Sequence, residues 1–119
     1  MQNTPENIRK MINQMLQACR NIEAATFVIP TAQSIDKDAV DNFYMCMTII
    51  LEAYMEIDGD HKYIFASINW DEVVRYIHIL KMDFDKIDRQ KLFFACRNMF
   101  PTLLEKVVDI SNRFDSKSF

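Results

Sequence analysis

Glycine is almost absent from this chain of 119 residues, which has one glycine, Gly59, and three prolines. Loops that cradle phosphates or dinucleotides need several glycines, because the backbone must approach the ligand closely. Sheet-rich folds need glycine as well, in their tight turns. The scarcity excludes glycine-rich nucleotide sites and argues against a β fold. Long helices joined by short loops remain.

The chain also lacks an excess of basic charge and any long apolar run. It carries 14 basic and 17 acidic residues, for a net charge of −3. Nucleic-acid-binding domains usually present a basic patch, so we expect no nucleic-acid partner. A membrane span needs about 18 consecutive apolar residues, and charged residues interrupt every apolar stretch before that length. The first residues also lack the apolar core of a signal peptide. We therefore expect a cytoplasmic protein without a membrane-spanning segment.

Residues for metal or catalytic chemistry are few and widely spaced. The three cysteines, Cys19, Cys46 and Cys96, match no zinc or redox spacing. Each falls on an apolar stripe, which predicts buried, reduced thiols. His61 and His78 have no second ligand one helical turn away. We predict no metal, no cofactor and no catalytic residue. A small helical enzyme whose polar groups converge only in space stays as an alternative.

Hydrophobic residues make up 50% of the chain and recur at helical spacing. Residues 1–119 are predicted to form a single all-α domain, a compact bundle of five or six helices with a polar end at about 112–119. The expected segments are a helix from Pro5 to before Pro30, a helix over 35–57, a short helix over 61–68, a helix over 70–80, and a last helix to near Asn112. The 70–80 helix is apolar nearly all round, so we expect it to be central. Pro101 should kink the last helix or divide it into two nearly coaxial helices.

Capping residues support these boundaries. Thr4 and Asn69 each precede a predicted helix and can accept a hydrogen bond from its first turn. Ser34 or Asp36 suits the start of the second helix, and Asp85 or Asp88 suits the start of the last.

One segment carries a family resemblance. Residues 64–70 read Ile-Phe-Ala-Ser-Ile-Asn-Trp and are followed by Val73-Val74-Arg75-Tyr76. This stretch resembles the first homology segment of the Bcl-two family of apoptosis regulators. There, a short apolar helix leads into Asn-Trp-Gly-Arg and then into a central apolar helix. The similarity covers residues 63–80, with Asn69-Trp70 as the clean match, and extends elsewhere only to helix order. The short chain is most similar to the virus-encoded members.

The resemblance implies a Bcl-two-like fold and an anti-apoptotic function in the cytoplasm of a host cell. Such a protein would sequester pro-apoptotic proteins by holding their amphipathic death-motif helix in an apolar groove. The groove expected from it consists of Tyr44, Met47, Leu51, Tyr54, Met55, Ile64, Phe65, Ile68, Asn69, Trp70, Val73, Val74, Arg75 and Ile77.

This chain departs from the family where the ligand's charge is recognised. Asp71-Glu72 stands in place of the family's Gly-Arg. Arg75 lies one turn further along the same face, so we expect it to meet the ligand's aspartate at a solvated rim. The competing hypothesis is a helical interaction module without a groove, such as an immunity protein or an inhibitor of host signalling. The sequence also leaves homodimer formation open.

Overall fold

The computed structural model describes residues 3–117, and every regular element in this range is helical. The four α-helices are α1 (Pro5–Phe27), α2 (Lys37–Met55), α3 (Trp70–Leu80) and α4 (Arg89–Asp115). Three short 3-10 helices lie between them: η1 (Ala32–Ser34), η2 (Gly59–Phe65) and η3 (Phe84–Lys86). The prediction of an all-α fold is confirmed. With η2 counted, the described residues contain five longer helical segments, and the sequence predicts five or six.

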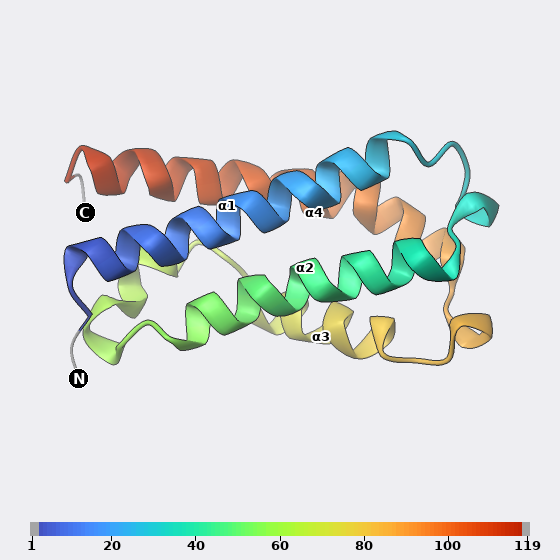
Figure 1. Ribbon diagram of the computed structural model, residues 1–119, viewed down its shortest axis with the longest axis horizontal. Helices are drawn as coiled ribbons and strands as arrows, with labels where there is room; N and C mark the ends of the chain where they lie inside the picture. Colours follow the sequence, from blue (N-terminus) through green and yellow to red (C-terminus); the bar gives the residue numbers. More distant parts are fainter. Residues whose placement is uncertain (1–2, 118–119) are drawn as a thin grey trace.

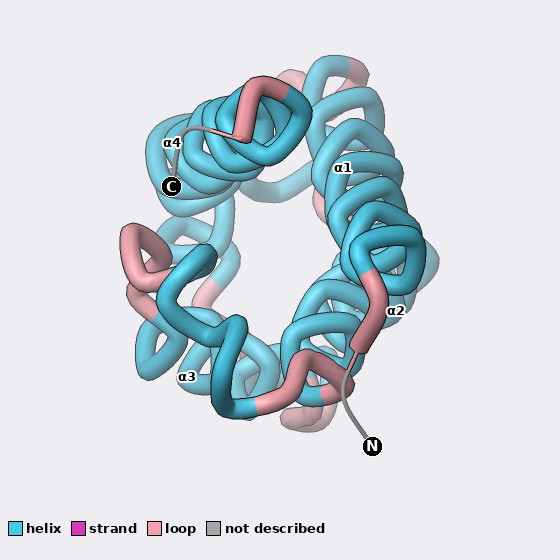
Figure 2. Tube along the Cα trace, turned by 90° about the vertical axis from the view of Figure 1, so that its left-hand side faces the viewer, coloured by secondary structure: helices cyan, strands magenta, loops and turns pink. Residues whose placement is uncertain are grey.

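The α-helices alternate in direction along an elongated bundle of 43 × 24 × 19 Å (Figure 1). Viewed from the end, they surround one core in the order α4, α1, α2, α3 (Figure 2). The first helix therefore packs against both α2 and the last helix, α4.

Within residues 3–117 no α-helix lies at the centre of the bundle, so the prediction of a central 70–80 helix is wrong. In α3, Val73, Ile77 and Leu80 are buried, whereas Arg75 and His78 are exposed. The sequence pattern was misleading because apolar side chains on the flanks of α3 pack against neighbouring helices of the bundle. They do not require that helices surround α3 on every side. Those flanks carry Tyr76 and Ile79, both half-buried.

The predicted helix starts are confirmed by their capping hydrogen bonds. Thr4 Oγ1 accepts from the Asn7 N–H at 3.2 Å, and Asn69 Oδ1 accepts from the Glu72 N–H at 3.2 Å. At the two ambiguous starts the later residue is the cap. Asp36 accepts from the Ala39 N–H at 2.8 Å, and Asp88 accepts from the Lys91 N–H at 3.0 Å. Caps of this kind each stabilise a helix by about 0.5–2 kcal/mol.

Three predicted segments differ in detail. The helix predicted over 35–57 is two residues shorter at each end, Lys37–Met55. The segment predicted over 61–68 is helical, but it begins at Gly59 and ends at Phe65. The last helix runs through Pro101 as one element and continues past Asn112 to Asp115. Of the polar end predicted at about 112–119, residues 118–119 lie outside the described residues.

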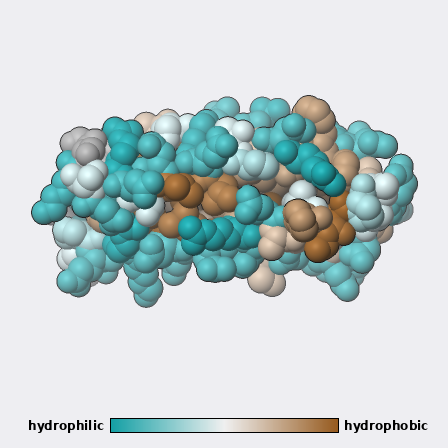
Figure 3. Space-filling view, turned by 90° about the horizontal axis from the view of Figure 1, so that it is seen from above, coloured by the Kyte–Doolittle hydropathy of each residue, from teal (hydrophilic) through white to brown (hydrophobic). Residues whose placement is uncertain are grey.

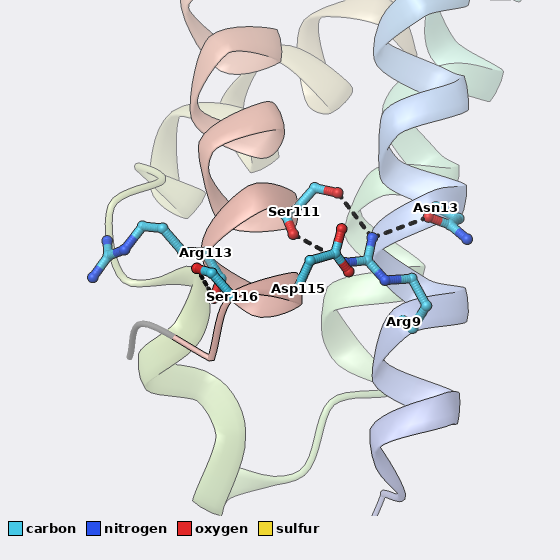
Figure 4. A network of polar contacts seen from close by, with 6 residues as sticks. All are labelled: Arg9, Asn13, Ser111, Arg113, Asp115 and Ser116. Carbon is cyan, nitrogen blue, oxygen red and sulfur yellow. Dashed lines mark hydrogen bonds and ion pairs between the residues drawn. The ribbon is translucent and has the colours of Figure 1, made fainter.

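A polar cluster explains why α4 continues to Asp115. The guanidinium of Arg9 on α1 donates to Ser111 Oγ at 2.8 Å and to the Ser111 carbonyl at 2.9 Å. It also pairs with the Asp115 carboxylate and lies 5.2 Å above the Phe114 ring. Figure 4 shows this side chain extending from α1 to the last turns of α4. One arginine thus joins the start of the first helix to the end of the last.

A second polar cluster joins the segment before α1 to η2. The Asn3 N–H donates to Asp58 Oδ2 at 2.7 Å, and the Asp58 N–H donates to Asn3 Oδ1 at 2.7 Å. Asp58 also caps η2 by accepting from the His61 N–H at 3.1 Å, and it contacts the His61 ring. The hydrogen bond from Asn3, followed by that from the His61 ring, lowers the pKa of the Asp58 carboxyl.

This lowered pKa predicts a loss of stability in acid. The Asp58 carboxylate stabilises the fold above its unfolded-state pKa of about 4, and this contribution is lost as pH falls through the lower folded-state pKa. In urea unfolding followed by circular dichroism, Asp58→Asn should reduce the midpoint at pH 7 and flatten its decrease below pH about 4. Asp41→Asn removes an exposed carboxylate on α2 and serves as the control. Equal acid dependence in Asp58→Asn and wild type would contradict the prediction.

Candidate functional site

The fourteen residues of the predicted groove lie on α2, η2, the turn at 66–69 and α3, and six of them are buried in the core. Three are exposed: Met55, Asn69 and Arg75. The buried members are Met47, Ile64, Phe65, Ile68, Val73 and Ile77. The half-buried members are Tyr44, Leu51, Tyr54, Trp70 and Val74. A ligand could reach the buried members only if the helices separated.

Two cavities touch this set. One, of about 340 Å³, reaches only Ile64 of the set and is otherwise lined by Pro5, Ile8, His61, Tyr63, Phe114 and Lys117. The other is small. It has a volume of about 40 Å³ and lies between α3 and α4, where Ile68, Asn69 and Val73 form part of its wall. This is roughly the space of one water molecule, which occupies about 30 Å³ in the liquid. It cannot accept a side chain of a ligand helix.

Trp70 has a structural role in closing this region. Its indole N–H donates to the Phe65 carbonyl at 3.1 Å, and its ring stacks on Tyr54 with 3.8 Å between centroids. Lys62 also contacts Tyr54. Its Nζ donates to the Tyr54 carbonyl at 2.7 Å and lies 3.7 Å from the Tyr54 ring centroid. Trp70 is half-buried. Asn69 caps α3, so the matching pair Asn69-Trp70 fixes the junction between η2 and α3.

Arg75 lies on the solvent side of α3. It is exposed and forms no ion pair with any residue of the described range 3–117. A carboxylate that met Arg75 here would be largely solvated, as expected for a rim position. Whether a ligand makes this contact stays a prediction.

A much larger apolar cleft lies on another face, between the C-terminal part of α1 and the middle of α4. Its volume is about 660 Å³, within the range of about 300–1,000 Å³ typical of ligand pockets. The residues lining it are Cys19, Glu23, Ala24, Thr26, Phe27, Cys96, Arg97, Phe100 and Pro101. The small side chains among them leave the space between the two helices unfilled.

Exposed apolar side chains accompany this cleft. Phe27 is 88% exposed, the next residue, Val28, is 75% exposed, and Phe94 on α4 is 69% exposed. Figure 3 looks down on the face of α1 and α4, where hydrophobic residues appear between hydrophilic ones along the middle and gather again toward the end of α1. Large exposed aromatic groups beside an apolar hollow mark a binding surface.

The cleft carries one charge of each sign. Glu23 on α1 is exposed. Arg97 on α4 donates from Nη2 to the Ile29 carbonyl at 3.0 Å, and its guanidinium lies 4.8 Å from the Phe93 ring centroid. Neither charged group has an ion-pair partner within residues 3–117. Both are available to a molecule bound in the cleft.

The sequence does not reveal this cleft, because its walls come from the first and the last helix. The buried face of α1 includes Ile8, Met15 and Ile22. Phe27 and Val28 lie beyond these residues, at the end of the helix and just before Ile29-Pro30, a place with no core role in the helical pattern. Two large apolar residues left over at a helix end are the signal that could have indicated a surface site.

The thiols at the bottom of the cleft are suited to packing rather than chemistry. Cys19 and Cys96 are 3% and 2% exposed. Burial, with a smaller contribution from nearby Cys46, raises the pKa of Cys19 to about 12. Burial also raises the pKa of Cys96, and a hydrogen bond with Thr26 lowers it by less, so that the pKa is about 11. The three cysteines are free and buried, as predicted.

These thiols should react slowly and make the fold sensitive to alkali. We expect an aromatic disulfide reagent to label folded protein roughly 100-fold or more slowly than unfolded protein, which corresponds to an opening free energy of about 3 kcal/mol. Because burial raises the thiol pKa, the folded state keeps the thiol proton at pH values where the unfolded state loses it. The free energy of unfolding should therefore fall as pH rises from about 9 toward 12. Cys19→Ala should flatten this decrease in urea unfolding. Rapid labelling of two thiols in folded protein would contradict the prediction.

Other functional groups do not gather in the part of the chain that the structure describes. Within residues 3–117, no three His, Cys, Asp or Glu side chains lie close enough to hold a metal ion. The described helices include none long and apolar enough to cross a membrane.

No protein-family model, curated protein or solved structure matches this chain.

Proposed function

We propose that this protein is an interaction module that holds an amphipathic helix of a partner protein in the cleft between α1 and α4. The observation that carries the proposal is an apolar cleft of about 660 Å³ beside Phe27, whose side chain is 88% exposed. A helix laid between two antiparallel helices can insert apolar side chains at one-turn intervals. The hydrophobic groups on this face in Figure 3, one along the middle and one toward the end of α1, offer such a helix separate apolar contacts.

Burial can provide the affinity. Each Leu, Ile or Phe anchor of the ligand contributes about 1.5–3 kcal/mol when it leaves water. Ordering a disordered ligand segment costs about 2–5 kcal/mol. Four anchors together contribute about 6–12 kcal/mol, which exceeds this cost without an ion pair.

The resemblance to the Bcl-two family supports one partner class, the death-motif helix of a pro-apoptotic protein. Under this proposal the chain acts as a viral-type anti-apoptotic protein that sequesters its partner. We place the ligand in the α1–α4 cleft, because the stack of Trp70 on Tyr54 closes the surface where the resemblance implied a groove.

The same closed surface favours a second candidate. If the cleft holds no helix, the chain is an interaction module that uses a flat face, as an immunity protein or an inhibitor of host signalling would. The side chain of Met55 at the end of α2, 68% exposed, offers an apolar contact for such a partner.

Calorimetric titration with a panel of death-motif peptides tests the proposal. Wild type should bind at least one peptide more tightly than about 50 µM. Ala24→Arg places a charged side chain in the cleft and should weaken binding at least tenfold, about 1.4 kcal/mol. Met45→Arg, which adds the same charge on α2, is the matched control and should bind as wild type. Arg75→Ala should change the affinity by no more than about 1 kcal/mol, as for a rim pair.

Two outcomes would overturn the proposal. One is that no death-motif peptide binds wild type at that concentration. The other is that Ala24→Arg binds as wild type while Arg75→Ala loses more than tenfold, which would place the ligand over α3.

A further inference from the structure

The α1–α4 face contains both a hollow and an aromatic ring large enough to fill it. Phe27 stands at the rim with 88% of its surface exposed, and Ala24, Cys19 and Cys96 leave the space beside it open. An apolar cavity of about 150 Å³ already admits benzene, so the cleft can hold an aromatic side chain. The ring next to the cavity cannot fill it in this conformation of its own chain. A second molecule can supply the ring.

We propose that a second copy of this chain covers the cleft, forming a two-fold dimer in which Phe27 of each copy enters the cleft of the other. The dimer is the resting form of the site, and a partner helix must displace the second copy. Only this last step rests on the proposed function.

The geometry of the face is self-complementary, as a two-fold interface requires. A two-fold axis that runs parallel to the helices above this face, midway between α1 and α4, places α1 of each copy over α4 of the other. Phe27 then lies above the cleft of the second copy, which lies between the same two helices. Val28 and Phe94, 75% and 69% exposed, are covered by the same contact. A small apolar ligand in the cleft would leave these side chains in water.

The charges at the cleft satisfy the same symmetry. Glu23 on α1 and Arg97 on α4 line opposite walls, and neither has an ion-pair partner within residues 3–117. When α1 of one copy lies over α4 of the other, each Glu23 faces Arg97 of the second copy. Arg97 uses Nη2 to donate to the Ile29 carbonyl. A guanidinium has five N–H donors, so others remain for a carboxylate. Two equal ion pairs then flank the two buried rings.

Sedimentation velocity between about 1 and 100 µM tests the dimer. Wild type should sediment as a dimer at the upper end, and Phe27→Asp should raise the dissociation constant at least tenfold. Because Phe27 is so exposed, this variant should fold, which circular dichroism verifies. Met45→Asp, at a side chain 61% exposed on α2, is the matched control and should dimerise as wild type. A monomeric wild type at about 100 µM, or unchanged association of Phe27→Asp, would overturn the proposal.

A charge exchange identifies the paired surfaces. Glu23→Arg and Arg97→Glu each place like charges opposite one another, so each variant alone should be monomeric. A mixture of the two should form a heterodimer, because every Arg then faces a Glu in both pairs. A folded mixture that stays monomeric would contradict the pairing. If Arg97→Glu does not fold, since Arg97 bonds to Ile29, the comparison of Phe27→Asp with wild type decides.

The dimer and the proposed function can fail separately. A dimer that binds no death-motif peptide overturns the function and leaves the dimer established. Peptide binding by a wild-type monomer overturns the dimer and leaves the function established. If both hold, adding peptide should convert dimers into complexes of one chain with one peptide. If two chains stay associated while saturated with peptide, the peptide and the second copy do not occupy the same cleft, and that part of the proposal is overturned.

Discussion

Replacement of Phe43 by alanine is expected to lower the free energy of unfolding by about 3–5 kcal/mol, the range for removal of a large aromatic side chain from a core. Phe43 on α2 is fully buried, and its ring centroid lies 6.4 Å from that of Phe100 on α4. Figure 2 places α2 and α4 on a diagonal of the bundle, so this pair fills the middle. Phe100 in turn meets the edge of Tyr76 on α3 at 5.9 Å.

Urea unfolding followed by circular dichroism measures this loss. Small domains have a total stability of about 5–15 kcal/mol, so Phe43→Ala should be close to the limit of folding. Phe94→Ala removes the same side chain at a position 69% exposed on α4, and its loss should stay within about 0.5 kcal/mol. A loss below about 1 kcal/mol for Phe43→Ala would show that the core does not depend on this pair.

Trp70→Ala is the second large effect, expected to cost about 3 kcal/mol, the lower end of the range for tryptophan because the residue is half-buried. The variant loses the stack on Tyr54 and leaves the Phe65 carbonyl without its indole donor. The junction between η2 and α3 should loosen as a result.

Trp70→Phe separates the two contributions in the same unfolding assay. Phenylalanine keeps a ring for Tyr54 but cannot donate to Phe65, so it should lose only about 0.5–1.5 kcal/mol from the missing hydrogen bond. Equal losses for Trp70→Ala and Trp70→Phe would show that the stack contributes nothing. A loss below about 1 kcal/mol for Trp70→Ala would mean that Trp70 does not anchor α3.

Local features of the fold could be predicted from the sequence, because they depend on residues a few positions apart. A cap such as Asn69 bonds to a backbone N–H three residues later, so its role follows from neighbouring letters. The apolar stripe of α1 likewise specifies which face is buried. The passage of α4 through Pro101 was predictable because the apolar phase continues on both sides.

Features that join distant segments could not be predicted in the same way. Whether α3 is central depends on how many helices surround it. A surrounded helix and a helix that packs between two neighbours can both have apolar flanks, so the sequence does not distinguish them. The groove hypothesis grouped residues on α2, η2 and α3 correctly in space. It could not show that Tyr54 and Trp70 fill the space between them. The α1–α4 cleft depends on how Phe27 and Pro101 are brought together, which no local pattern contains.

The pairing of the first helix with the last has a consequence for synthesis of the chain. While the ribosome is still adding residues, α1 has only α2 to pack against, and the side of its stripe that belongs to α4 stays in water. At typical rates of about 5–20 residues per second, this state lasts several seconds. The contact of Arg9 with Ser111 and Asp115 forms only after the last turn of α4 has been made. Completion of the core is therefore a late step, and until then the nascent chain exposes the apolar side of α1 that packs against α4.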